Sequence, residues 1–234
     1  MSKKLKYLKP SLILLTTILN IAIMLPNKAE VKKETNKKQG EKTIKKEEVK
    51  IQNESVPQVQ DKSSSEIVLI QTEKGPIKIK LFTKEAPITT SNFTELAKKG
   101  FYNGTVFHRV VENFVIQGGD PLGDGTGNYI DPESGKPRFI KLETNPNLKF
   151  DRPGRVGMAR TRDPNSASCQ FFIALQALPS LNPGGVDKFG YAVFGQVTDD
   201  TFETVKEIVK ESKPAFPGSD RPANPVKMHL VTLQ

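Results

Sequence analysis

Few segments limit the possible folds of this chain as strongly as residues 107–120, FHRVVENFVIQGGD. Two apolar runs are joined there by the polar pair Glu112-Asn113, a pattern that predicts a β-hairpin. Arg109 lies within the first of these runs. Because an unpaired guanidinium is costly to bury, its side chain must either reach water or line a pocket that binds a polar ligand. The residues of this segment leave both interpretations open.

Segments with the alternation or apolar content of β-strands recur along the rest of the chain. The eight that we predict are 66–72, 76–82, 105–111, 114–117, 156–159, 170–174, 192–197 and 226–233. Turn signals separate them, including Glu73-Lys74-Gly75 between the first two. This arrangement predicts a mainly β fold, a closed eight-stranded antiparallel barrel.

Two amphipathic helices are predicted between these strands. The first begins at Pro87, which a helix tolerates in its first turn, and stops at Gly100. Its apolar side is expected to hold Ile88, Phe93, Leu96 and Ala97. The second spans 201–210 and is ended by Pro214 and Pro217.

A long irregular region, 118–155, follows the hairpin, and loops of this length in a compact domain are usually functional. Its glycine run is only superficially like a phosphate-binding loop, because the Lys-Ser/Thr ending and a following helix are missing. We therefore expect these glycines to serve the conformation of the chain. The two histidines, His108 and His229, suggest no metal site.

The charge of the chain is unevenly distributed. Residues 1–65 hold 14 lysines against 7 acidic residues, whereas residues 66–234 hold 21 basic and 19 acidic residues. The excess of +9 thus belongs mainly to the N-terminal part, and it predicts no nucleic-acid surface on the folded part.

Cys169 is the single cysteine, so no intrachain disulfide can form. A small buried thiol is favoured there over a reactive one.

The N-terminus has the layout of an export signal, with four lysines in the first nine residues followed by the apolar run 11–25. A buried core helix is the alternative, but the lysine-rich stretch that follows offers it nothing to pack on. Residues 1–29 are therefore interpreted as a signal peptide or membrane anchor. Cleavage stays open, because the run is short for a membrane span while 27–29 is a poor cleavage site.

Residues 30–65 are rich in Lys, Glu, Gln and Ser and show no sustained periodicity. Such a segment cannot bury enough apolar surface to offset its chain entropy, so a disordered linker is predicted. A charged single helix around 41–50 is the alternative. The folded domain is expected to span 66–234 and to lie outside the cytoplasm, in a periplasm or lumen, secreted or held at a membrane.

Five motifs in this order resemble the cyclophilin-type peptidyl-prolyl isomerases: FHRVV, FVIQGGD, GTG, SxSCQFFI and YAVFGQV. The similarity covers about 67–233. It implies an eight-stranded barrel with a packed interior, a helix over each open end and a ligand site on the outside. It also implies catalysis of rotation about X-Pro peptide bonds in proline-containing polypeptides. That rotation changes no covalent bond, so no metal or cofactor is expected.

The resemblance also assigns roles to individual residues. Arg109 matches the catalytic donor that polarises the prolyl nitrogen in the twisted state. Four residues match the proline pocket: Phe114, Val115, Phe172 and Leu181. The positions beside this pocket are matched by the polar Gln117 and Gln170, by Ala159 and Arg160 at a strand end that pairs with substrate, and by His108 and Tyr191 at the rim. By simple strand alternation His108 faces away from Arg109, which favours a structural histidine.

Four departures from the family pattern affect the site. Val115 stands where Met is common, Arg160 replaces Asn, and Tyr191 replaces His, as it does in bacterial members. Ser180 replaces the Trp on which cyclosporin binding in the family relies. The insertion 183–190 lengthens this rim.

The leading hypothesis is an exported or membrane-tethered, monomeric prolyl isomerase of bacterial type that assists the folding of extracytoplasmic proteins. The alternative is a binding or chaperone module that holds proline-containing segments without turning them over. A structural scaffold comes third.

Overall fold

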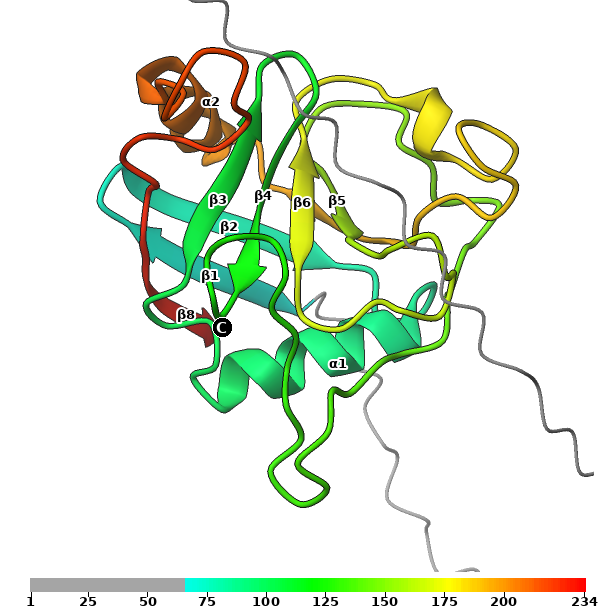
Figure 1. Cartoon of the computed structure of the whole chain (residues 1–234). Coiled ribbons are helices and arrows are strands. Elements are labelled where there is room, and N and C mark those ends of the chain that lie inside the picture. The colour runs from blue at the N-terminus through cyan, green and yellow to red at the C-terminus, as the bar shows by residue number, and fades with distance from the viewer. Residues whose placement is uncertain (1–65) are drawn as a thin grey trace, which may run out of the picture. The chain divides into compact units, whose positions relative to one another are not determined.

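The computed structural model describes residues 66–234 (Figure 1). The predicted signal or anchor, 1–29, and the predicted linker, 30–65, lie outside the described residues, so both stay predictions. Within 66–234, no helix combines the length and the apolar content needed to span a bilayer.

Eight strands form one antiparallel sheet that curves around an apolar core. They are β1 Ile67–Thr72, β2 Gly75–Leu81, β3 Val106–Val111, β4 Val115–Asp120, β5 Arg155–Met158, β6 Phe171–Ala174, β7 Val193–Val197 and β8 Met228–Leu233. Their spatial order is β3-β4-β6-β5-β7-β2-β1-β8. At the two ends of this order, β3 and β8 meet through a bridge between Val106 and Lys227, and Phe107 N–H donates to the Val226 carbonyl at 2.9 Å.

The barrel is therefore nearly closed, and the predicted mainly β, eight-stranded antiparallel barrel with two helices is confirmed. Buried and exposed side chains alternate along β2, so that one face of the sheet covers the core. Ile77 and Ile79 on that face are fully buried, whereas Lys80 on the other face is exposed. Asn113 adopts a φ of 59° in the tight turn between β3 and β4, as the hairpin pattern predicts.

Two helices pack on this sheet, α1 Pro87–Lys98 and α2 Phe202–Glu211. Figure 1 shows α1 running below the strands and α2 at the opposite end. Phe93 and Leu96 of α1 are fully buried, as predicted. The prediction for Ile88 is wrong, since this residue is 45% exposed. At 3.6 residues per turn it lies about 140° around the helix from Phe93, outside the apolar stripe.

The barrel interior is filled by aromatic side chains. Phe93 contacts Tyr102, Phe171 and Phe194 with ring centroids 5.0–5.2 Å apart, and all four residues are fully buried. Such a close-packed interior has no room for a ligand. Any binding site of the domain must therefore lie on its outer surface.

Cys169 lies in this core. Its side chain is fully buried, and burial raises the pKa of its thiol to about 11. The interpretation of Cys169 as a small buried thiol is confirmed.

A second apolar cluster lies on the opposite, outer face of β4, β6 and β7. Its buried members are Val115, Phe150, Phe172, Ala174, Leu178, Leu181 and Val193. The 3-10 helix η1, Pro179–Leu181, supplies one of them. Alternation explains the two clusters, because Phe171 of β6 belongs to the inner one and Phe172 to the outer one.

Gly157 of β5 lies directly against this outer cluster. A Cβ atom there would stand 2.6 Å from the ring carbon Cζ of both Phe150 and Phe172. We predict that Gly157→Ala lowers the free energy of unfolding by about 1–3 kcal/mol through overpacking, as measured by urea denaturation. An unchanged urea midpoint would show instead that the two rings move aside without cost.

Candidate functional site

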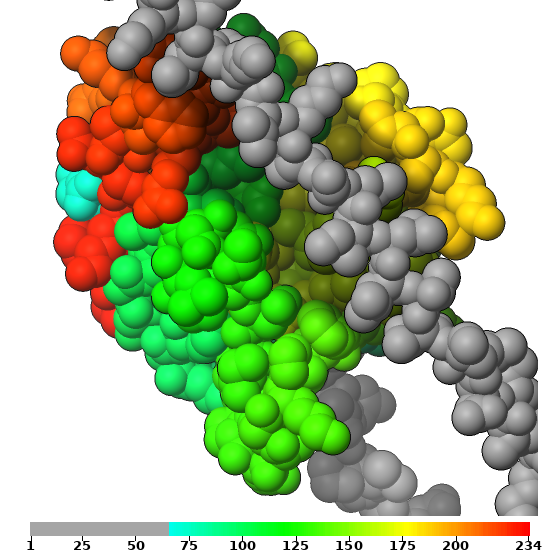
Figure 2. All heavy atoms as spheres, viewed as in Figure 1, coloured from blue at the N-terminus to red at the C-terminus, as the bar shows by residue number. Residues whose placement is uncertain are grey.

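A cavity of about 280 Å³ opens on the outer face of the barrel. Nine side chains line it: Arg109, Phe114, Val115, Gln117, Ala159, Arg160, Phe172, Leu181 and Tyr191. They come from β3, the turn between β3 and β4, β4, β6, η1 and the segments that follow β5 and precede β7. In Figure 2 the green surface that follows β4 and the gold surface of about 175–190 stand on either side of a recessed region. The structure thus brings together nine of the residues singled out from the sequence.

The apolar part of the cavity rests on Phe172. This ring stacks on Phe150 with centroids 5.3 Å apart and meets the Tyr191 ring edge-on at 5.7 Å. Val115 and Leu181 add buried aliphatic surface beside it. Because each ring is fixed by another ring or by the sheet, the result is a preformed apolar notch on the outer face of the barrel.

Arg109 supplies the cationic side of the cavity. Its Nε donates to Oδ2 of Asp220 at 3.0 Å, and its Nη2 forms an ion pair with the same oxygen at 2.9 Å. The guanidinium lies 5.9 Å from the centre of the Phe114 ring. The side chain is 36% exposed. Both interpretations left open by the sequence therefore apply, since the guanidinium lines the cavity and also reaches water.

Asp220 was not found by sequence reasoning. It lies in the segment between α2 and β8, which Figure 1 shows beside β3, and its carbonyl accepts the Val110 N–H at 2.8 Å. No local motif marks this residue, because its proximity to Arg109 depends on a contact between segments 111 residues apart.

Gln170 lines a second cavity, of about 350 Å³, rather than the first. The two cavities share Gln117, Ala159 and Arg160. Gln117 donates to the Gln170 side-chain oxygen at 2.9 Å, and Gln170 donates to the carbonyls of Gly125 and Gly127 at 3.0 and 2.9 Å. Gln170 therefore links the glycine-rich loop to Gln117, which lines the first cavity.

The glycine-rich loop is organised by a carboxylate of the protein itself. Asp120 is buried and accepts the N–H groups of Leu122 at 2.9 Å, Asp124 at 3.1 Å and Gly125. The backbone donors that a phosphate loop would offer to a ligand are thus already used. This supports the conformational interpretation of the glycines.

His108 lies apart from both cavities, which corrects its predicted place at the rim. It is 4% exposed, and neither ring nitrogen has a hydrogen-bond partner among the described residues. The pairing of β3 with β4 is irregular between Phe107 and Arg109, and His108 turns inward behind Gly125. Burial lowers the pKa of His108, an effect that the nearby Asp120 opposes. The structural interpretation of this histidine is thus favoured.

Within 66–234, no three side chains of His, Cys, Asp or Glu converge in a way that would hold a metal ion. The first cavity itself combines the Arg109 guanidinium with the apolar notch of Val115, Phe172 and Leu181.

The family model for cyclophilin type peptidyl-prolyl cis-trans isomerase/CLD matches residues 67–233, a range that includes all eight strands and both helices. The chain belongs to the cyclophilin family. Its barrel, its packed interior and its outer cavity agree with what the sequence motifs imply for a cyclophilin.

Individual relatives differ in how much of their length this chain covers. A spliceosome-associated protein CWC27 homolog of Danio rerio is 38% identical over 175 residues, which are 75% of this chain and 34% of that protein. The chain thus spans about a third of that relative. A probable peptidyl-prolyl cis-trans isomerase A of Mycobacterium bovis is 36% identical over 179 residues, 70% of this chain and 90% of that protein.

Among solved structures, a cyclophilin-type peptidyl-prolyl cis-trans isomerase of Cryptosporidium parvum, crystallised in the presence of the dipeptide Ala-Pro, superposes with a TM-score of 0.62. It is 32% identical to this chain, and the match covers 72% of this chain and 98% of that one.

The buried His108 gives the cyclophilin domain a testable pH dependence. Its folded-state pKa lies below the ordinary 6.5, so the unfolded chain takes up a proton first as the pH falls. Above about pH 7 the His108 ring is neutral in both the folded and the unfolded state, so its titration does not change the free energy of unfolding. From about pH 6.5 downwards the free energy of unfolding declines, until the pH reaches the folded-state pKa. Urea denaturation between about pH 7.5 and 5.5 measures this loss.

His108→Gln is the matched variant, because Gln stays neutral over this range while His229 is retained. We expect a smaller loss of stability on acidification in the variant than in the wild type. An identical loss in both proteins would show that His108 does not carry it.

Proposed function

We propose that this protein is a peptidyl-prolyl cis-trans isomerase that accelerates rotation about X-Pro bonds in polypeptides. The observation that carries the proposal is the juxtaposition of the Arg109 guanidinium with the apolar notch of Val115, Phe172 and Leu181. Tyr191, together with the loop DPNSAS at 163–168, supports a member of bacterial type.

The reaction needs an environment rather than a reactive group. Rotation about a peptide bond must overcome a barrier of about 18–20 kcal/mol, because it breaks amide resonance. In the twisted state the prolyl nitrogen regains its lone pair and becomes a hydrogen-bond acceptor. A donor aimed at that nitrogen stabilises the transition state more than the planar ground state, which is the condition for catalysis.

Arg109 fits this role in charge and in geometry. The guanidinium carries five N–H groups in a rigid plane, of which the Nε–H is donated to Asp220. The remaining donors are free to bind a substrate carbonyl and to polarise the nitrogen. Phe114 and Phe172 would meanwhile grip the proline ring, and the chain flanking it would lie along 159–161, which borders both cavities.

A non-catalytic module that binds or chaperones proline-containing segments is the second candidate. The ion pair with Asp220 favours it, because a guanidinium that already has an anionic partner is less strongly drawn to substrate. Val115 and Ser180, which replace larger side chains common in the family, also change the surface that contacts a peptide.

Arg109→Ala tests the catalytic proposal. In a protease-coupled assay with a proline-containing peptide and the full chain, we expect kcat/KM to fall by about 100-fold or more, because a transition-state donor is removed. Asp220→Ala frees the guanidinium without deleting it, so its loss is expected to be smaller. Arg155→Ala removes an arginine that pairs with Asp151 outside the cavity, and activity should be retained.

Unchanged activity of Arg109→Ala would end the catalytic assignment. Peptide binding without exchange enhancement in NMR would favour the chaperone alternative.

We further propose that the protein works outside the cytoplasm, as a monomer, on exported proteins that are folding. The four lysines followed by the apolar run 11–25 support this location. After cell fractionation we expect the protein in the extracytoplasmic or membrane fraction, and N-terminal sequencing then distinguishes a cleaved signal from a retained anchor. Recovery of the intact chain from the cytosol alone would contradict the proposed location.

A further inference from the structure

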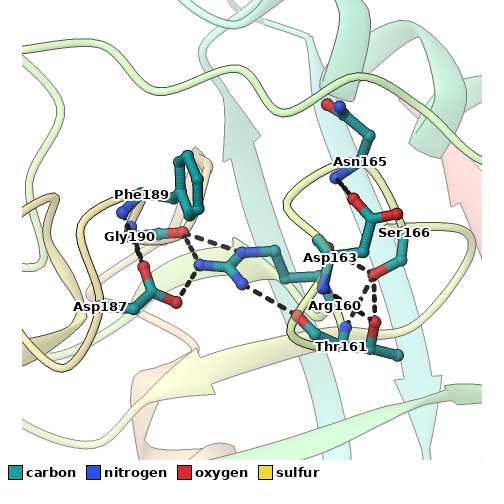
Figure 3. Close-up of polar contacts among 8 residues, drawn as sticks. All are labelled: Arg160, Thr161, Asp163, Asn165, Ser166, Asp187, Phe189 and Gly190. Atoms are coloured by element: carbon teal, nitrogen blue, oxygen red, sulfur yellow. Dashed lines mark hydrogen bonds and ion pairs between the residues drawn. The ribbon is translucent and has the colours of Figure 1, made fainter.

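Arg160 lines both cavities, yet its side chain is only 1% exposed. Its Nε and Nη2 donate to the Gly190 carbonyl at 3.0 and 2.6 Å, and Nη1 donates to the Thr161 carbonyl at 2.9 Å. Nη2 also pairs with the Asp187 carboxylate. Figure 3 shows this side chain extended between the two segments that it joins. A guanidinium with so many internal partners is not available to bind a charged substrate.

One of these segments is the rim loop, defined here as 182–190. Asp187 organises it, since its carboxylate accepts the N–H groups of Phe189 at 2.8 Å and Gly190 at 2.7 Å (Figure 3). The Arg160 guanidinium beside Asp187 lowers the pKa of that carboxyl. At its other end, the Asn182 side chain accepts the Phe150 N–H at 2.9 Å. The Val186 N–H also donates to the Ser180 carbonyl at 2.7 Å. The rim loop is therefore held to the domain at several points, and Arg160 supplies the side-chain contacts at its C-terminal end.

The same guanidinium supports a wall of the first cavity. It lies 4.5 Å from the centre of the Tyr191 ring, whose edge meets Phe172. Tyr191 N–H also donates to the Leu181 carbonyl at 3.0 Å. Arg160 thereby holds, through Tyr191, the side of the notch that faces the rim loop.

On its other side Arg160 contacts a border of the second cavity. The Thr161 carbonyl that it binds belongs to a turn in which Thr161 N–H donates to the Ser166 hydroxyl at 2.9 Å and Asp163 accepts the Asn165 N–H at 2.9 Å. Figure 3 shows these residues on the opposite side of Arg160 from Asp187. Arg160 thus separates the two cavities and contacts a border of each.

We infer that Arg160 is a positioning residue, which fixes Tyr191 and the rim loop so that the first cavity keeps a width suited to a proline ring. This inference rests on the proposed function, because it concerns the same site. By the resemblance, the substrate contact at this position, where Asn is common, is largely made by the main chain. Here the side chain has a role of its own, because it holds the rim loop through Gly190 and Asp187.

The inference depends on fork geometry as well as on charge. A lysine carries a single ammonium, which cannot reach Gly190, Thr161 and Asp187 together. Removing the guanidinium would also leave the Gly190 carbonyl without its side-chain donor and the Asp187 carboxylate without its cationic partner. Arg160→Lys and Arg160→Asn should therefore both loosen the wall, whereas Asp187→Asn removes the charge of one partner and should act more weakly.

Arg155 offers a matched control. It also donates to a carboxylate, Asp151 at 2.8 Å, and lies 5.3 Å from the centre of an aromatic ring, Phe82, but it borders neither cavity. Arg155→Asn thus reports the effect of losing a similar arginine elsewhere in the domain.

The experiment uses the full chain and the peptide Ala-Ala-Pro-Phe, with Kd from NMR titration and the on-enzyme exchange rate from exchange spectroscopy at saturation. We expect Arg160→Asn and Arg160→Lys to raise Kd about fivefold, the ratio for losing about 1 kcal/mol of positioned contact. The exchange rate at saturation should stay within about twofold, because Arg109 is untouched. Arg155→Asn should leave Kd unchanged.

A folded Arg160→Asn variant with the Kd of the wild type would overturn the inference, and so would an equal rise in Kd for Arg155→Asn. If Arg160→Asn does not fold, Arg160→Lys and Asp187→Asn decide by the same criterion. If the wild type binds the peptide without enhancing exchange, the catalytic function fails while the Kd comparison still tests the positioning role. A wild type that does not bind the peptide would refute both.

Discussion

Close packing of the barrel interior is the constraint from which the rest of the domain follows. Phe93, Phe171 and Phe194 fill the space inside the sheet, so no ligand can enter there. Alternation along β6 then places Phe172 on the outer face, where it stacks on Phe150. Because Phe172 is adjacent to the core residue Phe171 on the same strand, the packed core also fixes the floor of the external notch. A catalyst that must hold a substrate ring in one orientation benefits from such a floor.

Two arginines at this notch show how different surroundings give one side chain different roles. Arg109 has one carboxylate partner, keeps donors free and is 36% exposed. Arg160 is enclosed by Gly190, Thr161, Asp187 and the Tyr191 ring and is 1% exposed. The first can act on a ligand, whereas the second can act only on the protein.

Local patterns in the sequence predicted the strands and helices well, because alternation, helical spacing and turn residues are short-range signals. Ile88 was predicted on the buried side of α1, but it lies outside the narrow apolar stripe of that helix. The resemblance placed His108 at the rim of the site, but in β3, whose pairing with β4 is irregular there, this residue is buried apart from both cavities. The site residues came from the resemblance, since Phe114 and Phe172 taken alone are typical of ordinary core. The contacts of Asp220 with Arg109 and of Arg160 with the rim loop were not predicted from the sequence, because they join segments that only the fold brings together.

The place of β3 in the barrel has a consequence for the whole notch. β3 is a terminal strand of the sheet order and meets β8 through a short seam, while Phe172 lies on β6, within the continuous part of the sheet. The cation and the floor of the notch therefore belong to parts of the domain with unequal resistance to local opening. Separation at the seam would part Arg109 from Asp220, which lies in the segment before β8, while β4 would still join β3 to β6 and its aromatic floor, so closure of the cylinder is what keeps the guanidinium anchored at the notch.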